Sequence, residues 1–206
     1  MLDNVAAMCL SVAGRFSLRD IMNVVKTAIP GLLIIEPKVL GDHRGFFMEL
    51  YQADRYATSG AGRRFVQDNL SRSSKGVLRG LHFQNPRPQG KLVTVLRGSV
   101  LDVVVDVRRG SPTFGRHVAV ALDDENRRQF WVPRGLAHGF VVQSDTADFL
   151  YKCDDFYSPG NEIVLRWNDP ALGIDWGCDA PSVSARDGEG RSLAELEEFL
   201  PRYESS

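Results

Sequence analysis

Short runs in which apolar and polar residues alternate dominate the chain from Lys91 onward. Each run is bounded by Gly, Pro, Asp or Ser, the residues that favour turns. A period of two residues turns one face of a strand inward and frees the other to line a cavity. The inward face is assigned to Val93, Val95, Val103, Val105, Val118 and Val120. The pattern predicts an all-β fold, a jelly-roll or double-sheet barrel.

The two ends of the chain differ from this pattern. Residues 23–45 read as strand, turn and strand, whereas residues 1–21 match no clear strand period. We expect 1–21 to be an N-terminal extension outside the fold and 22–206 to form one domain. A chain of 206 residues with 43% hydrophobic residues suffices for one well-buried core and is short for two.

Only the C-terminal end has a helical pattern. Ser192 and Glu195 have the spacing of a capping box. At helical spacing one face would be shared by Leu193, Leu196, Phe199 and Leu200. The expected architecture is therefore a jelly-roll β-sandwich or barrel with a few short helices, including one at the C-terminus.

Charge and hydropathy exclude several partners. The 25 Lys and Arg residues nearly balance 26 Asp and Glu residues, so no net charge attracts nucleic acid or an anionic membrane. No apolar run approaches the about 20 residues that span a bilayer. Val5 to Ala13 lacks the basic flank of a signal peptide. An anionic ligand would need a local cluster of cations.

The cysteines and histidines argue against disulfides and metals. Cys9, Cys153 and Cys178 are odd in number and form no CxxC pair, which favours a reducing cytoplasm. The four histidines, His43, His82, His117 and His138, are scattered with no HxH pair. Because a metal-binding cupin usually starts from such a pair, we expect no metal.

The segment GVLRGLHFQNPRPQGKLV gathers Arg79, His82 and Lys91 where a strand pattern begins. A lone histidine is more often a structural hydrogen-bonding residue than a catalyst. Two neighbouring cations favour the catalytic reading of His82, because they suit a phosphate or a developing enolate oxygen.

Two further segments carry candidate chemistry. In WVPRGLAHGF, His138 lies between Ala137 and Gly139, whose small size allows close ligand approach. In DFLYKCDDFYSPGNE, alternation lets Tyr151 point inward with Phe149. Periodicity alone favours a core tyrosine with one satisfied hydroxyl at Tyr151.

A series of motifs runs in order from about Met22 to about Leu200: DHRGFFMEL, VQDN, VLRGLHFQ, QGKLV, GSVLDVVVDVRRGSPTFG, FWVPRGLAHGF, FLYKC and SARD. Together they resemble the dTDP-4-dehydrorhamnose 3,5-epimerase family. Such a series is far more specific than any single motif.

The resemblance implies a role for each matching residue. It makes His82 the general base, and Asp187, in SARD, the carboxylate that orients and charges its imidazole. Tyr151 looks like the general acid on the opposite face of the sugar, and Lys91 like the cation that stabilises the enolate. The implied substrate contacts are Arg79 toward the diphosphate, His138, Arg44, Glu49, Gln67, Asn69, Glu162 and Arg186. The family commonly has lysine where Arg186 stands.

The resemblance implies epimerisation at C-3 and C-5 of dTDP-4-keto-6-deoxyglucose to the keto precursor of dTDP-L-rhamnose, without cofactor, in a homodimer. Hydrogens beside a ketone can be removed if the enolate is stabilised, which requires a base, a cation and an opposed acid. The alternatives are an epimerase of one carbon, an isomerase that moves the ketone, a non-catalytic sugar-nucleotide-binding barrel and a metal-dependent cupin oxygenase.

Overall fold

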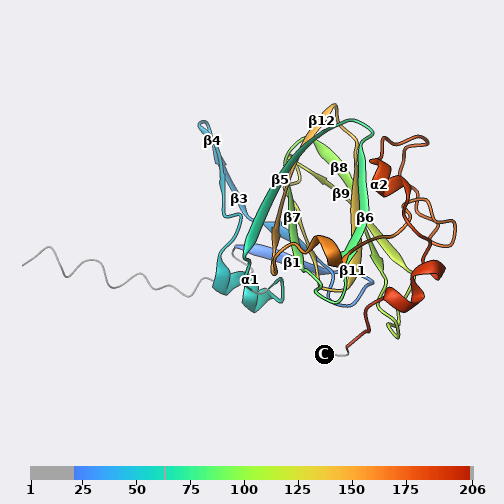
Figure 1. Ribbon diagram of the computed structural model, residues 1–206. Coiled ribbons are helices and arrows are strands. Elements are labelled where there is room, and N and C mark those ends of the chain that lie inside the picture. Colours follow the sequence, from blue (N-terminus) through green and yellow to red (C-terminus); the bar gives the residue numbers. More distant parts are fainter. Residues whose placement is uncertain (1–20, 63, 205–206) are drawn as a thin grey trace, which may run out of the picture.

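Two antiparallel β-sheets face each other in the computed structural model, which describes residues 21–62 and 64–204 (Figure 1). The six-stranded sheet has the order β1 (Met22–Lys26), β2 (Leu33–Pro37), β10 (Gln129–Val132), β7 (Lys91–Arg97), β12 (Thr146–Cys153) and β5 (Gln67–Ser74). The five-stranded sheet has the order β13 (Glu162–Val164), β6 (Leu78–Gln84), β11 (Leu136–Val142), β8 (Ser99–Asp106) and β9 (His117–Asp123). The predicted all-β jelly-roll is confirmed. Residues 1–20 of the predicted extension, with Cys9, lie outside the described residues.

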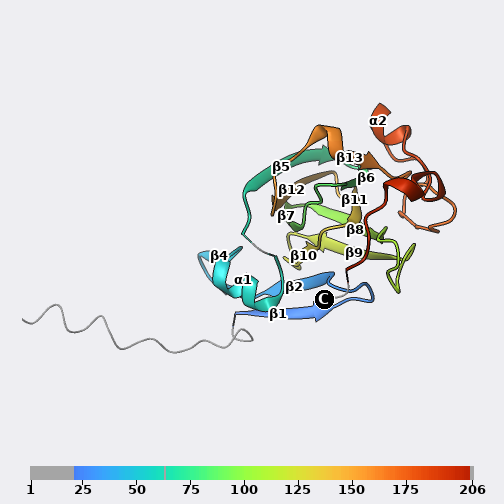
Figure 2. The same cartoon turned by 60° about the horizontal axis from the view of Figure 1, so that its bottom comes forward.

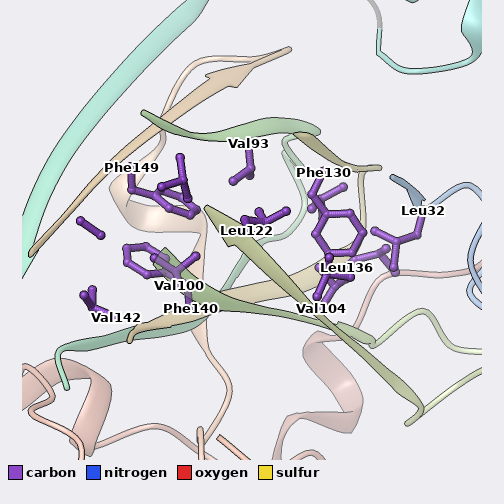
Figure 3. Close-up of a cluster of buried hydrophobic side chains, with 14 of the residues drawn as sticks. Leu32, Val93, Val100, Val104, Leu122, Phe130, Leu136, Phe140, Val142 and Phe149 are labelled. Atoms are coloured by element: carbon purple, nitrogen blue, oxygen red, sulfur yellow. The ribbon is translucent and has the colours of Figure 1, made fainter. Parts of the chain in front are cut away.

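The main core fills the space between the sheets (Figure 3). Phe130 and Phe149 from the six-stranded sheet meet Val104 and Phe140 from the five-stranded sheet. The inward positions predicted on β7 and β9 are confirmed, because Val93, Val95 and Val120 are buried in this core and Val118 packs against it.

Strand β8 is buried on both faces, which alternation did not predict. Val104 belongs to the core between the sheets, but Val103 and Val105 point to the other side of β8. There they pack with residues of the C-terminal segment, including Trp176 and Leu196. The prediction that Val103 and Val105 face the barrel interior is therefore wrong, because the C-terminal segment covers the outer face of this sheet (Figure 2).

Three short helical turns follow the last long strand: η2 (Pro159–Asn161), α2 (Ala185–Gly188) and η3 (Ala194–Phe199). The predicted capping box is present, with Ser192 N donating to Glu195 Oε2 at 2.7 Å. The turn it begins is a 3-10 helix that buries Leu196 and leaves Phe199 46% exposed. Phe199 does not share the buried face of Leu196 and Leu200, because its ring packs against the guanidinium of Arg191 at the surface. No helix in the described part is long and apolar enough to cross a membrane.

A small hairpin of β3 (Val39–Asp42) and β4 (Gly45–Met48) projects from the body, beside helix α1 (Ala53–Ser59) (Figure 1). Helix α1 covers the outer face of the six-stranded sheet, where the Tyr56 hydroxyl donates to Gln129 Oε1 at 2.6 Å. The hairpin itself buries little, because Phe46 and Phe47 are 58% and 70% exposed.

Candidate active site

A cavity of about 660 Å³ opens between the two sheets, with helix α2 at its edge. Nine of the predicted site residues line it: Asn69, Arg79, His82, Lys91, His138, Tyr151, Glu162, Arg186 and Asp187. These residues are up to 118 positions apart in the sequence, between Asn69 and Asp187. The fold therefore brings most of the predicted site to one place.

A bulge in β6 turns two functional side chains to the same side. Opposite β11, His82 pairs with His138 and Arg79 with Phe140, so β6 uses one residue more than its partner. Residues three apart on a regular strand would face opposite ways, yet Arg79 and His82 both line the cavity. Gly80 allows this close approach, because a Cβ there would lie 2.6 Å from Gly139 Cα.

His82 and Asp187 form a hydrogen-bonded pair, with His82 Nε2 2.7 Å from Asp187 Oδ1. The Gly80 N–H also donates to this carboxylate, at 3.3 Å, and Ser184 caps the short helix that carries it. Burial acts to raise the pKa of Asp187, but the hydrogen bond and charge of His82 and these donors outweigh it and lower the pKa. One imidazole nitrogen is thus held by a carboxylate, and the other is left to accept a proton.

Tyr151 and Lys91 stand on the opposite wall, on neighbouring strands of the six-stranded sheet. Lys91 Nζ lies 5.9 Å from the centroid of the Tyr151 ring. Burial lowers the pKa of Lys91, against the opposing charges of Cys153, Glu162 and Asp102. Burial also raises the pKa of Tyr151, which keeps its hydroxyl protonated. A cation and a proton donor therefore face the histidine base across the cavity.

Three side chains from separate segments meet at the mouth. Glu162 on β13 accepts hydrogen bonds from the Tyr157 hydroxyl, at 2.7 Å, and from Arg186 on α2. Burial acts to raise the pKa of Glu162, and these two donors lower it. The 45% exposure of Tyr157 places it at the rim of the cavity.

The polar wall beside the mouth comes from β5 and β6. Arg79 Nε donates to Ser73 Oγ at 3.0 Å, which holds the guanidinium over the cavity. Gln67 does not line the cavity. It donates to Asn69 Oδ1 at 3.0 Å and accepts from the Tyr157 N–H at 2.9 Å, so it supports two lining residues.

Two predicted nucleotide contacts lie elsewhere. Arg44, at the turn of the projecting hairpin, forms an ion pair with Asp42. Glu49, just after β4, forms an ion pair with Arg55 of α1. Neither residue lines the cavity of its own chain.

Sequence reasoning missed the partner of His138. His138 Nε2 lies 2.9 Å from Asp102 Oδ1, and Asp102 is completely buried. The available signal was a charged residue inside the apolar run SVLDVVVDV. Phe140 and Phe149, stacked with ring centroids 3.9 Å apart, also line the cavity and were not assigned to it. Within residues 21–62 and 64–204, no group of three or more His, Cys, Asp or Glu could hold a metal ion.

Comparison with known proteins identifies the relatives of this chain. Residues 26–195 match the family model described as dTDP-4-dehydrorhamnose 3,5-epimerase. A protein of that name from Pseudomonas aeruginosa is 51% identical over 180 residues, which are 86% of this chain and 99% of the relative. Another from Neisseria gonorrhoeae is 49% identical over 183 residues, 88% of this chain, and the chain spans 56% of that longer relative.

Solved structures agree with the sequence comparison. A crystal structure of dTDP-6-deoxy-D-glucose-3,5-epimerase from Legionella pneumophila, in complex with dTDP-4-keto-L-rhamnose, is 54% identical with a TM-score of 0.86. It aligns with 89% of this chain and 100% of its own. A 4-keto-6-deoxy sugar epimerase from the novobiocin gene cluster of Streptomyces spheroides is 42% identical, with a TM-score of 0.85 over 88% of this chain and 94% of its own. The chain belongs to the dTDP-4-dehydrorhamnose 3,5-epimerase family.

Proposed function

We propose that this chain epimerises dTDP-4-keto-6-deoxy-D-glucose at C-3 and C-5 to dTDP-4-keto-L-rhamnose, within dTDP-L-rhamnose or related deoxysugar biosynthesis. One observation carries the proposal: the His82 and Asp187 pair faces Tyr151 and Lys91 across one cavity. Epimerisation beside a ketone requires a base on one face of the sugar and an acid on the other. The two facing sheets supply one each.

His82 removes the proton. Its free ring nitrogen takes the hydrogen from the carbon beside the C-4 ketone, and the electron pair of the broken C–H bond moves onto the ketone oxygen. The imidazole becomes an imidazolium, which the Asp187 carboxylate stabilises at 2.7 Å. Asp187 is 4% exposed, so this charge pair is shielded from water.

Lys91 stabilises the enolate oxygen. An ammonium fixed in a partly buried site needs no reorganisation when the negative charge develops, and one such donor commonly contributes about 3 kcal/mol. Arg79 lines the same cavity and offers donors suited to the diphosphate. Asn69 and the mouth residues Glu162 and Arg186 contact the remainder of the nucleotide.

Tyr151 returns a proton from the opposite face. Its hydroxyl gives a proton to the carbon of the enolate, the ketone re-forms, and solvent reprotonates the tyrosinate. Tyr157 fits this role less well, because its hydroxyl already donates to Glu162 at the rim. The imidazolium of His82 releases its proton to solvent, and the same base and acid then serve C-3 and C-5 in turn.

The reaction moves protons and no hydride, so we propose that it needs neither a nicotinamide nor a metal. Residues 22–206 act as one epimerase domain. The free thiols of Cys153 and Cys178 support a location in the cytoplasm.

The active form is proposed to be a homodimer. Arg44 and Glu49 match nucleotide-binding positions of the family but lie outside the cavity of their own chain. Arg44 lies at the turn of the hairpin and Glu49 directly after it, and the hairpin's Phe46 and Phe47 are exposed. Docking of this hairpin on a second copy would bury the two rings and bring Arg44 to the partner's nucleotide.

The test is incubation with dTDP-4-keto-6-deoxyglucose in deuterated water, with both ring carbons followed by NMR. Deuterium at C-3 and C-5 with formation of the epimerised product is expected, and none with His82→Ala. Deuterium at one carbon only would identify a single-carbon epimerase. Nucleotide binding without any exchange would identify a non-catalytic barrel and refute the proposal. Activity should survive exhaustive chelation with EDTA.

A further inference from the structure

An ion pair lies next to Lys91 but outside the cavity. Asp154 directly follows β12, and Arg134 comes two residues after the end of β10. Arg134 Nε donates to Asp154 Oδ2 at 2.9 Å, and Arg134 Nη2 donates to the Asp154 carbonyl at 3.2 Å. The side chain of Asp154 is 2% exposed and that of Arg134 is 38% exposed. Neither residue lines the cavity, so ligand contact does not account for the pair.

The pair lies at the start of β7, the strand between β10 and β12. Lys91, the first residue of β7, is paired with Val132 on β10 and with Cys153 on β12. Each of these neighbours ends its strand, and the chain continues from it to one member of the ion pair. The two strands that flank β7 are therefore joined to each other beside the residue that precedes Lys91.

That residue, Gly90, is bound to Asp154 through both of its backbone polar groups. Its N–H donates to Asp154 Oδ1 at 2.7 Å, and its carbonyl accepts from the Asp154 N–H at 3.1 Å. A Cβ at this position would lie 2.6 Å from Trp131 Cη2 and 2.9 Å from Asp154 Oδ2, so only glycine fits without a shift of its neighbours. Hydrogen bonds and close packing thus fix the backbone that leads into Lys91.

The position of the Lys91 ammonium depends on this backbone. Within residues 21–62 and 64–204, no protein acceptor forms a hydrogen bond with it, and the Tyr151 ring centroid lies 5.9 Å away. A lysine side chain is flexible, so the place of its backbone decides where its charge can reach. Tyr151 lies on β12, three residues before Asp154. The contact between Asp154 and Gly90 therefore also sets the spacing between the strands that carry Lys91 and Tyr151.

We propose that Asp154 is a positioning residue, which fixes the start of β7 and thereby places the Lys91 ammonium relative to Tyr151. The inference rests on the proposed function, in which Lys91 stabilises the enolate. Asp154 touches no substrate and acts through the Gly90 peptide. Arg134 supplies the charge that compensates its buried carboxylate.

The first measurement observes Lys91 without substrate. Carbon NMR of protein labelled with 13C at lysine Cε reports on each ammonium, and the Lys91 signal is assigned by its loss in Lys91→Arg. In Asp154→Ala this signal should move toward the position of an exposed lysine, while those of Lys26, Lys38 and Lys75 stay in place. An unchanged Lys91 signal would overturn the inference. This readout does not depend on turnover, so it is separable from failure of the proposed function, which would show as no exchange in wild type.

The second measurement compares the kinetics of matched variants. Asp154→Ala should lower kcat by about 10-fold or more and change KM by less than about threefold, because a misplacement of about 1 Å can cost about 100-fold in rate. Asp154→Asn retains an acceptor for the Gly90 N–H and should recover most of the loss. Asp155→Ala is the control, because the adjacent carboxylate binds Arg87, whose side chain is 53% exposed. Equal losses in Asp154→Ala and Asp155→Ala, or a wild-type kcat in Asp154→Ala, would refute the role.

The third measurement asks whether Asp154 acts through Lys91. In a Lys91→Ala background, Asp154→Ala should cause no further loss of deuterium exchange, because residues that act as a unit have non-additive effects. A full additional loss would show a merely structural role and refute the inference. If Asp154→Ala does not fold, Gly90→Ala perturbs the same contact, since its Cβ would displace Trp131 and the carboxylate. The Lys91 signal should then shift in Gly90→Ala, and an unchanged signal in that folded variant would overturn the inference.

Discussion

If Tyr151 is the proposed acid, its hydroxyl determines whether proton removal leads to inversion. In Tyr151→Phe the base and Lys91 remain, so the enolate should still form but be quenched mainly from the side on which it formed. Solvent deuterium should then enter the ring carbons faster than the epimerised product accumulates. The loss in folding free energy should be small, about 1 kcal/mol for one hydrogen bond. NMR of the reaction in deuterated water measures both rates.

Tyr157→Phe is the matched control, because it removes a hydroxyl from the rim that donates to Glu162. It should lower nucleotide affinity and keep exchange and inversion in their wild-type ratio. If exchange and inversion fell equally in Tyr151→Phe while their ratio changed in Tyr157→Phe, the acid would be Tyr157.

At the level of single residues, the motifs predicted which side chains form the cavity better than periodicity did. Alternation alone would place Arg79 and His82 on opposite faces of β6, and only the bulge at Gly80 turns both inward. The contact of His82 with Asp187 depends on where the C-terminal segment places helix α2, which no local pattern predicts. Asp102 was missed because an isolated aspartate in an apolar run does not reveal its partner.

Strand β8 ends at Asp106, whose buried carboxylate accepts hydrogen bonds from the loop that follows. Asp106 accepts from Arg108 Nη2 at 2.9 Å and from the hydroxyls of Ser111 and Thr113, both at 2.6 Å. Burial acts to raise the pKa of Asp106, but these donors lower it. A lowered folded-state pKa contributes stability that is complete above the unfolded value near about 4 and is lost as pH falls through the folded value.

Asp106→Asn should therefore lower the free energy of unfolding by about 3 kcal/mol near neutral pH, since it leaves Arg108 buried without its partner. Below about pH 4 the wild-type protein should lose part of its extra stability over Asp106→Asn. The difference in Tm between the two proteins should therefore narrow in acid. Thermal unfolding at several pH values measures this. Asp68→Asn is the control, because Asp68 pairs with Lys152 and its side chain is 55% exposed. A constant Tm difference across the acid range would contradict the assignment.

Among the elements, strands with one buried face were predictable and the others were not. The projecting hairpin has no alternating pattern to detect, because nearly all its residues are exposed. The sequence of strand β8 predicts one buried face, but the C-terminal segment buries its second face as well. The spacing of Ser192 and Glu195 predicts the capping box. It does not predict that the turn which follows is a 3-10 helix.

For the whole molecule, a dimer that shares sites predicts complementation between two inactive variants. If Arg44 acts on the partner's cavity, a mixed dimer of Arg44→Ala and His82→Ala contains one complete site. Random reassembly of equal amounts should restore about one quarter of wild-type activity. Deuterium exchange on the refolded mixture, with sedimentation to verify the dimer, is the measurement.

The matched control combines His82→Ala with Asp187→Asn, two residues of the same cavity. Every site in that mixed dimer keeps one defect, so activity should stay at the level of the separate variants. Equal behaviour of the two mixtures, in sedimenting dimers, would show that Arg44 serves its own chain.

Helix α2 has only four residues, yet its Arg186 binds Glu162 at the mouth while the adjacent Asp187 is hydrogen-bonded to His82, the proposed base. The barrel strands supply Lys91, Arg79 and Asn69 without it. On the proposed function, the strands carry the base His82 and most of the ligand contacts, whereas the carboxylate that orients the base comes from α2. A duplicated copy of this chain could lose its chemistry and retain its ligand through a single change in that helix.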